Sequence, residues 1–356
     1  MHEPPANDVV DRLVAVDPIT RDHWLGRLGE PGAHAAAMQS LPAMHQIEVG
    51  GSQPVSRTHE PETIAVIAWN LERGTHVDAA AAIIGSHRAN VVLASEVDVG
   101  MARSGNRHTA ADLAGALGHQ YAFGVEFVEL DLGDAQERAS LRRDATNAGG
   151  FHGNAITADR LIEDPILIRI EQRGSWFATG GDQPRIGGRM ALAARVTLDE
   201  RPVVVASVHL ESESDPALRH AQLATVLDAI ELHYGSLPAV IGGDLNTFSA
   251  PIHEARTSFR SLRDADPSRW CWPVPYEPLF EAAAQHGFDI ERANPREQTM
   301  RLTVDQAAGA LLRLDWLLVR DLDVVTRSTV AAIGPDGAIL SDHDGVAATV
   351  RHAPRQ

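Results

Sequence analysis

The sequence predicts an α/β fold, and three observations support this prediction. A chain of 356 residues that is 44% hydrophobic can bury a sizeable core. From residue 63 onward, short apolar runs rich in β-branched residues recur, which is typical of strands covered on at least one face. Stretches with helical periodicity separate several of these runs. Together these features indicate sheets that are packed against helices.

The apolar runs predict nine strands. Each is short, and most are bounded by Gly, Pro, Asn or Asp. The predicted strands cover residues 63–70, 90–96, 153–157, 166–170, 190–198, 202–210, 238–244, 314–319 and 345–350.

Two helices are predicted between these strands. Asp215 can cap the first of them and Pro216 suits its first turn. Its apolar face comprises Leu218, Leu223, Val226, Leu227 and Ile230. The second covers about residues 75–88 and is expected to bury Val77, Ala80, Ala81 and Ile84.

Residues 1–62 differ from the rest in their sequence pattern and are predicted to form an N-terminal extension that ends in a linker. Helical fragments at residues 8–16 and 21–28 alternate there with Gly, Pro and Ser. The extension is interpreted as a packing arm, with an oligomer contact or a lid over a site as alternatives. The main domain is predicted to cover residues 63–351.

The charge of the chain limits its partners. The formal net charge is -17 and the pI is 5.4, so there is no global attraction to nucleic acid or to an anionic membrane. All 31 basic residues are arginine, which excludes a lysine general base or Schiff base.

Cysteine usage and the N-terminus bear on location. Cys271 is the single cysteine, so no internal disulfide can form, which favours a reducing, cytoplasmic setting. The first residues lack a basic region followed by an apolar stretch, and no run of 18 apolar residues occurs. We therefore expect neither a signal peptide nor a membrane span.

Polar residues recur at the ends of the predicted strands. Taken alone, each is most often a turn residue or a structural histidine. Independent turn residues would not be expected to follow one another in this order with an apolar predicted strand beside nearly every one. The set comprises Asn70, Glu96, Asn154, His209, Asp244, Asn246, Asp315, Asp342 and His343.

The motifs that carry these residues closely resemble the endonuclease/exonuclease/phosphatase superfamily. They read "WN", "SE", "GN", "SVHL", "GGDLNT", "LDW" and "SDH" in that order, and "GDLN" and the late "SDH" are the most specific. The resemblance covers roughly residues 63–351. It implies a four-layer α/β sandwich, in which two mixed sheets face each other, helices cover the outside and the site lies at one rim.

A divalent cation is the cofactor that this resemblance and the residue types indicate. Glu96, Asn70 and Asp342 supply oxygen ligands, which suit Mg²⁺ or Mn²⁺ better than zinc. The alternative for Glu96 is a strand-end carboxylate paired with an arginine.

Asp244 is expected to orient or deprotonate the attacking water. Asn246 would project to the same side if the chain stays extended there, and its amide would then hold the water, the phosphate or Asp244 itself. His343 and His209 are expected to donate to the non-bridging phosphate oxygens. The resemblance implies that Asp315 is the partner of His343.

Three further positions are interpreted with alternatives. Glu126 either orients His209 or is a partly exposed strand residue. Asn154 matches a superfamily position close to the scissile phosphate, or it is a turn residue. Arg189 either contacts a substrate anion or lies in a solvated loop, and it is not included in the catalytic set.

The predicted insertion at residues 250–301 follows the Asp-x-Asn strand and is placed to form a substrate rim. It contains Trp270, Trp272 and Tyr276 among prolines. These aromatic residues either stack on a base or an apolar leaving group, or pack the loop onto the sandwich, and packing is slightly favoured.

The favoured function is a divalent-metal-dependent phosphoesterase acting on a phosphodiester or phosphomonoester of a small molecule or lipid-like alcohol. A nuclease acting on single-stranded or damaged nucleic acid is an alternative that the negative charge disfavours. Abasic-site endonucleases carry a lysine two residues after the metal-binding glutamate, where this chain has Asp98. A non-catalytic binding module on the same fold is the third hypothesis. The sequence gives no oligomeric state.

Overall fold

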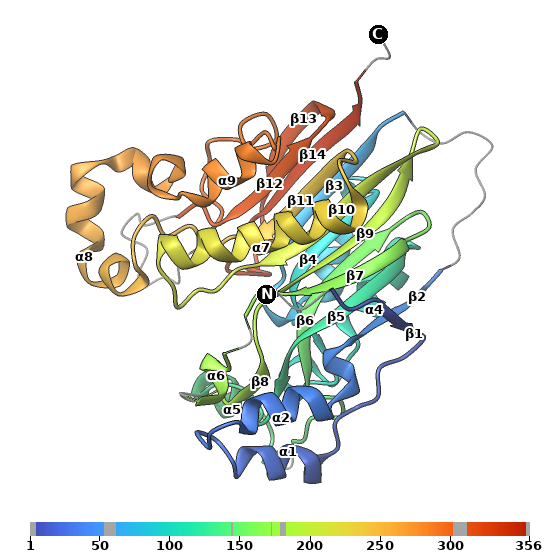
Figure 1. Ribbon diagram of the computed structural model, residues 1–356, viewed down its shortest axis with the longest axis vertical. Helices are drawn as coiled ribbons and strands as arrows, with labels where there is room; N and C mark the ends of the chain where they lie inside the picture. The colour runs from blue at the N-terminus through green and yellow to red at the C-terminus, as the bar shows by residue number, and fades with distance from the viewer. Residues whose placement is uncertain are drawn as a thin grey trace.

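Two mixed β-sheets lie face to face, and helices cover their outer sides (Figure 1). The computed structural model describes residues 5–52, 62–143, 145–171, 173–178, 183–301 and 312–353. The four-layer α/β sandwich predicted above is confirmed, and each of the nine predicted strands is present.

The larger sheet has nine strands within the described residues. The pairs β1–β2 and β3–β4 are parallel, and the other neighbours are antiparallel. In spatial order the strands are β1 (Asp8–Val10), β2 (Gln46–Gly51), β5 (Gln120–Glu129), β6 (Phe151–Ala158), β4 (Val91–Val99), β3 (Ile64–Asn70), β14 (Gly345–His352) and β13 (Leu322–Val330), with β8 (Arg185–Gly187) also paired to β5.

The smaller sheet has five strands in the described part of the chain, of which only β10 and β11 run parallel to each other. Its order is β12 (Asp315–Arg320), β11 (Ala239–Asp244), β10 (Arg201–His209), β9 (Met190–Leu198) and β7 (Glu163–Arg169).

The core lies between the two sheets and on their outer faces. Leu93, Leu192 and Leu317 are fully buried between the sheets. Gly242 lies in close contact with both sheets, because a Cβ atom there would lie 2.7 Å from the Leu317 side chain and 2.8 Å from Ala68. Gly242 therefore allows the two sheets to pack together at this point.

Helices cover the outside of both sheets. α3 (Val77–Ser86) and α4 (Thr109–Leu117) pack on the larger sheet, and α7 (Pro216–Tyr234) and α9 (Leu279–Gln285) pack on the smaller one. The predicted cap is confirmed, since the Asp215 carboxylate accepts the backbone N–H of Leu218 at 2.7 Å. The other α-helices in the described residues are α1 (Pro18–Leu25), α2 (Ala33–Ser40), α5 (Ala135–Ser140), α6 (Ser175–Ala178) and α8 (Ile252–Ala265). Within the described ranges, no helix combines the length and apolar character needed to cross a bilayer.

The N-terminal residues contribute two strands to the larger sheet. β2 pairs with β5, and β1 pairs in parallel with β2 through Val9 and Ile47. The prediction of a helical fragment at residues 8–16 is wrong, because residues 8–10 form an edge strand and residues 11–16 form no helix. α1 accounts for the first part of the fragment predicted at residues 21–28.

The tryptophans of the 250–301 segment are buried, so the packing interpretation holds for them. Trp272 lies with its ring centroid 5.3 Å from that of Trp316. Trp270 packs in a separate cluster with Phe248. Tyr276 is half-buried, and its hydroxyl donates to Asp266 at 2.5 Å.

Candidate active site

The strand register brings the polar residues of the smaller sheet to one rim. His209 ends β10 and pairs in register with Asp244, the last residue of the parallel strand β11. Asp244 in turn pairs with Asp315, the first residue of the antiparallel strand β12. Three positions far apart in sequence are therefore neighbours because of backbone pairing alone.

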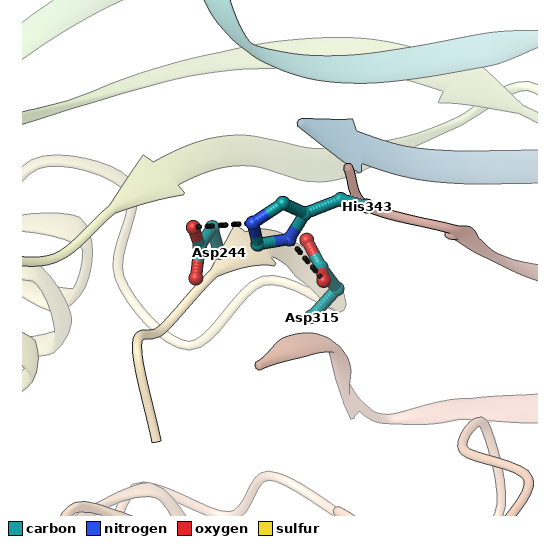
Figure 2. Close-up of side chains that lie close together, drawn as sticks. All are labelled: Asp244, Asp315 and His343. Atoms are coloured by element: carbon teal, nitrogen blue, oxygen red, sulfur yellow. Dashed lines mark hydrogen bonds and ion pairs between the residues drawn. The ribbon is translucent and has the colours of Figure 1, made fainter. Parts of the chain in front are cut away.

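His343 lies between two carboxylates of this rim (Figure 2). Its Nδ1 is 2.8 Å from Oδ2 of Asp315, and its Nε2 is 3.8 Å from Oδ2 of Asp244. The backbone is fixed as well, because the His343 N–H donates to Ser341 Oγ at 3.1 Å and Trp69 Nε1 donates to the His343 carbonyl at 2.7 Å. The predicted pairing of His343 with Asp315 is present in the structure.

The two carboxylates decide the charge of this imidazole. Burial lowers the pKa of His343, but Asp315 and Asp244 outweigh it, so that the pKa lies well above its ordinary value. The two carboxylates therefore favour the imidazolium form of His343, with Nδ1 held by Asp315 and Nε2 directed toward Asp244 (Figure 2).

The Asn70 side chain connects Glu96 of the larger sheet to Asp244 of the smaller sheet. Its Nδ2 donates to Oε1 of Glu96 and to Oδ2 of Asp244, at 3.2 Å in each case. Its Oδ1 accepts the backbone N–H of Glu72 at 3.1 Å. Glu96 and Asp244 thus converge on one amide group, although they come from different sheets.

Glu96 lies at an irregularity of β4 and forms an ion pair. The register between β4 and β6 shifts between Ala94 and Val97, and Glu96 has a φ of 52°. Arg73 pairs with the Glu96 carboxylate and also donates to Glu137 at 3.1 Å. The arginine partner considered as the alternative for Glu96 is therefore found in the structure.

Asp342 lies beside a carboxylate that the motif analysis did not include. Its backbone N–H donates to Oε2 of Glu72 at 3.0 Å. Burial and the charge of Asp342 both raise the pKa of Glu72. Among the described residues, no hydrogen bond or ion pair joins Asp342 to Glu96. The signal available in the sequence was the "LERG" stretch that directly follows Asn70.

The donor set of this rim fits a hard divalent cation. Glu96 and Asp244 bring two carboxylates to the same amide, and Glu72, after β3, and Asp342, before β14, add two more. Mg²⁺ and Mn²⁺ prefer such oxygen ligands. Asp244, Asp315 and His343 also lie within 4.8 Å of one another. One ligand atom from each of these three residues could therefore hold a cation as well, so the rim offers two adjacent groups of ligands.

His209 lies in a second buried ion cluster. Arg189 Nη1 is 2.9 Å from Nδ1 and 3.0 Å from Nε2 of His209, and it donates to Oε1 of Glu126 at 2.6 Å. Oε2 of Glu126 is 3.5 Å from His209 Nδ1, and His209 Nε2 is 3.7 Å from Oδ2 of Asp244. Glu126 is 0% exposed, which excludes the partly exposed alternative and places it beside His209.

Arg189 is the centre of this cluster, and its interpretation as a solvated loop residue is wrong. It is only 4% exposed. Burial lowers its pKa, but Glu211 and Glu126 raise it above the ordinary value. Burial raises the pKa of Glu126, but Arg189 and His209 outweigh that effect and bring it to about 2. A buried cation thus lies between two carboxylates and a candidate catalytic histidine.

Asn246 does not project as an extended strand would place it. Its φ is 49°, so the chain leaves the extended conformation there. Its Nδ2 donates to the Leu210 carbonyl at 2.8 Å, and its backbone N–H donates to Oδ1 of Asp244 at 2.9 Å. Asn246 therefore fixes the Asp244 carboxylate through its backbone. Gly243 has a φ of 145°, and a Cβ atom there would lie 1.9 Å from the Val208 carbonyl oxygen.

Asn154 lies inside β6 rather than at its beginning, so the turn interpretation is wrong. It is fully buried, and its Nδ2 donates to the Met190 carbonyl at 3.1 Å. Its Oδ1 is buried and has no hydrogen-bond partner in the described part of the chain.

Comparison with solved structures shows the same fold in several proteins. An endonuclease/exonuclease/phosphatase from Beutenbergia cavernae DSM 12333 is similar with a TM-score of 0.54 and 20% identity, over 82% of this chain and 72% of that one. Humanized D. rerio TDP2 has a TM-score of 0.51 and 16% identity, over 82% and 99% of the two chains. The human Nocturnin catalytic domain with bound sulfate anion has a TM-score of 0.51 and 14% identity, over 86% and 98%.

Sequence comparison identifies the family. No curated protein sequence shows a significant match to the chain. The model of the Endonuclease/Exonuclease/phosphatase family, whose members are hydrolases acting on phosphoester bonds, matches residues 67–343, which is more than half of the chain. The chain therefore belongs to the endonuclease/exonuclease/phosphatase family.

Proposed function

We propose that this protein hydrolyses a phosphodiester or phosphomonoester of a small molecule or lipid-like alcohol, with Mg²⁺ or Mn²⁺ as cofactor. The observation that carries the proposal is the buried His343 ring between Asp315 and Asp244, next to the Glu96 carboxylate and the Asn70 amide that donates to Glu96 and Asp244. A cationic donor, a carboxylate base and a hard-cation ligand set are the three components that phosphoester hydrolysis needs.

His343 and His209 bind the phosphoryl oxygens. Asp315 holds Nδ1 of His343, which leaves the Nε2–H to donate to a non-bridging oxygen. On the other side of Asp244, Arg189 and Glu126 fix the ring of His209. The Asn154 amide is proposed to lie close to the scissile phosphate.

Asp244 orients the attacking water and accepts its proton. The Asn246 backbone N–H holds Oδ1, and Asn70 holds Oδ2. Nε2 of His209 and Nε2 of His343 both lie within 4 Å of Oδ2, so the carboxylate that would act as the general base lies between the two proposed phosphate donors.

Glu96 would hold the metal together with Asn70, whose Oδ1 would bind the cation in place of the Glu72 N–H, and Asp342 and Glu72 lie on two adjoining segments. When bound, the cation would neutralise charge on the phosphoryl oxygens and assist the leaving oxygen. Binding requires the Glu96 carboxylate to exchange Arg73 for the cation. We further expect the protein to work in a reducing, cytoplasmic setting, on the basis of its single free cysteine.

A substrate panel tests this proposal against the nuclease alternative. Bis-aryl phosphates, mono-aryl phosphates and labelled single-stranded oligonucleotides are incubated with the Mn²⁺-loaded protein. We expect turnover of the aryl phosphates, its loss on chelation and its recovery when Mn²⁺ or Mg²⁺ is returned. Cleavage of the oligonucleotides alone would favour the nuclease. Failure to bind Mn²⁺ in a calorimetric titration would favour a non-catalytic binding module.

A further inference from the structure

Arg73 is a charged residue at the candidate metal site that has no assigned role in phosphate binding. Its Nη1 pairs with Glu96, and its Nε donates to Oε1 of Glu137 at 3.1 Å. The Glu96 carboxylate also accepts Nδ2 of Asn70, the same amide that donates to Asp244. The guanidinium therefore lies next to the carboxylate that would hold the cation.

The backbone that presents Arg73 adopts a conformation that residues other than glycine seldom take. Three successive residues after β3 have a positive φ, with 44° at Glu72, 68° at Arg73 and 67° at Gly74. The Gly74 N–H closes this turn by donating to the Leu71 carbonyl at 2.9 Å. Such conformations are found most often at functional sites, where surrounding contacts hold them in place.

The second partner of Arg73 is held firmly. Glu137 is part of the capping box of α5, in which its carboxylate accepts the Asp134 N–H at 2.7 Å. Arg103, whose side chain is only 2% exposed, donates to Glu137 at 3.3 Å and pairs with both oxygens of Asp98. A helix cap and a buried ion network therefore fix Glu137, which can keep Arg73 at the rim when Glu96 takes up a cation.

A cation at Glu96 would leave Nη1 of Arg73 without its carboxylate partner. The Arg73 side chain is 21% exposed, so water shields its charge only in part. A guanidinium in this position is stabilised by an anion, and its planar fork matches the oxygens of a phosphate. In the proposed function, the phosphoryl group of the substrate is the anion that reaches this site.

The number of donors bears on the kind of phosphoester. His343 and His209 are proposed to donate to non-bridging oxygens, and Arg73 would add a third cationic donor beside Glu96. A phosphodiester carries one negative charge and has two non-bridging oxygens, whereas a phosphomonoester carries up to two charges on three such oxygens. A third donor therefore complements the monoester.

We propose that Arg73 exchanges Glu96 for a non-bridging oxygen of the substrate when the cation binds, and that this contact makes a phosphomonoester the preferred substrate. The inference rests on the proposed function and narrows it to one class of phosphoester. Glu137 is a positioning residue, because it holds Nε of Arg73 and does not itself contact the substrate. Arg73 is thus the counter-ion of Glu96 in the metal-free protein and a phosphate ligand in the metal-loaded protein.

Inorganic phosphate and dimethyl phosphate are the probes, because the first presents the oxygens of a monoester and the second those of a diester. Each is titrated by calorimetry into the full chain at saturating Mg²⁺, and a separate Mg²⁺ titration establishes saturation for every variant. We expect the wild type to bind phosphate more tightly than dimethyl phosphate. In Arg73→Gln the affinity for phosphate should fall by about tenfold or more, and the affinity for dimethyl phosphate by less than about threefold.

Two further variants show whether the guanidinium itself is responsible. Arg107→Gln removes an exposed arginine that is paired with Asp78, and it should change neither affinity. Arg73→Lys keeps a positive charge and loses the planar fork, so it should recover only part of the phosphate affinity. In steady-state kinetics, Arg73→Gln should raise the KM for a mono-aryl phosphate and leave the KM for a bis-aryl phosphate unchanged.

Equal phosphate affinity in Arg73→Gln and the wild type at saturating Mg²⁺ would overturn the proposal. An equal loss of affinity for phosphate and dimethyl phosphate would overturn the assignment of the monoester. Failure of the wild type to bind Mg²⁺ would instead contradict the proposed function on which the inference rests. Loss of phosphate binding in an Arg73→Gln variant that still binds Mg²⁺ is the expected result, and a purely structural role of Arg73 would not produce it.

Discussion

The Asp315 carboxylate lies 2.8 Å from Nδ1 of His343, and both side chains are buried at the rim where the two sheets meet. This contact fixes the ring so that Nε2 is directed toward Asp244 (Figure 2). It also contributes to the raised pKa of His343, against the opposing effect of burial. The same pair therefore determines both the direction and the charge of the proposed phosphate donor.

Asp315→Asn should lower the pKa of His343 and narrow the pH range of activity. Because the proposed donor works as an imidazolium, activity is present below the pKa of His343 and is lost as the pH rises through it. Removing a carboxylate that raises this pKa should shift the alkaline limb of the kcat profile to lower pH. Profiles of wild type and variant, with Mn²⁺ held saturating, measure the shift. An unchanged alkaline limb would show that His343 does not control it.

Arg73→Ala should tighten Mn²⁺ binding. Arg73 pairs with Glu96, and both side chains are largely shielded from solvent, so a cation must displace the guanidinium to use this carboxylate. We expect a decrease in the Kd by about tenfold, measured by calorimetry. Arg107→Ala, which removes an exposed arginine paired with Asp78, is the matched control. Weaker binding in Arg73→Ala than in the control would mean that Arg73 supports the metal site.

Arg189→Met should destabilise the fold at neutral pH by about 3–5 kcal/mol, since it leaves buried carboxylates without their cation. The wild type itself should become less stable in acid. The pKa values of Glu126 and Glu211 fall to about 2, from the 4.5 of an ordinary glutamate, so their contribution is present above pH 4.5 and is lost as the pH falls toward 2.

Urea unfolding across this pH range tests both statements. The acid dependence should be much smaller in Arg189→Met, because the stabilised carboxylates are no longer paired. If the free energy of unfolding fell equally with pH in wild type and Arg189→Met, the proposed pairing of Arg189 with Glu126 and Glu211 would be contradicted.

Trp272→Ala should lower stability by about 3–5 kcal/mol without changing the KM for a small aryl phosphate. The indole is 9% exposed and packs against Trp316. It belongs to the hydrophobic cluster on the outer face of the smaller sheet, so we expect it to stabilise the fold. Thermal unfolding measures the loss of stability, and steady-state kinetics measure the KM. A raised KM with unchanged stability would restore the rim interpretation.

The apolar strands and the order of polar residues at their ends are features that the sequence predicts well. Strand β11 shows why: a buried run leads directly to Asp244, and local pattern and register agree. β5 was not among the predicted strands, because Glu126 and Glu129 interrupt its apolar pattern. Both are buried and paired with Arg189 and Arg185, which lie about 60 residues later in the chain.

Pairing between residues far apart in sequence also hides part of the site. Arg189 and Glu211 acquire their importance from each other and from His209, and no local signal distinguishes a buried arginine beside two glycines from a solvated one. The backbone at Asn246 is a further case, since its positive φ could not be inferred from the Asp-x-Asn spacing. Tertiary ion pairs determine the burial of Arg189 and Glu211, and the local turn determines the backbone conformation of Asn246.

Hydrolysis of a bis-aryl or mono-aryl phosphate by Asp244→Asn, with Mn²⁺ and beside wild type, tests the central claim most directly. The substitution keeps the shape of the side chain and removes the proposed base. We predict that kcat falls by about 10²- to 10⁴-fold while the circular dichroism spectrum and the unfolding midpoint show a folded protein. Full activity in the folded Asp244→Asn variant would contradict the mechanism.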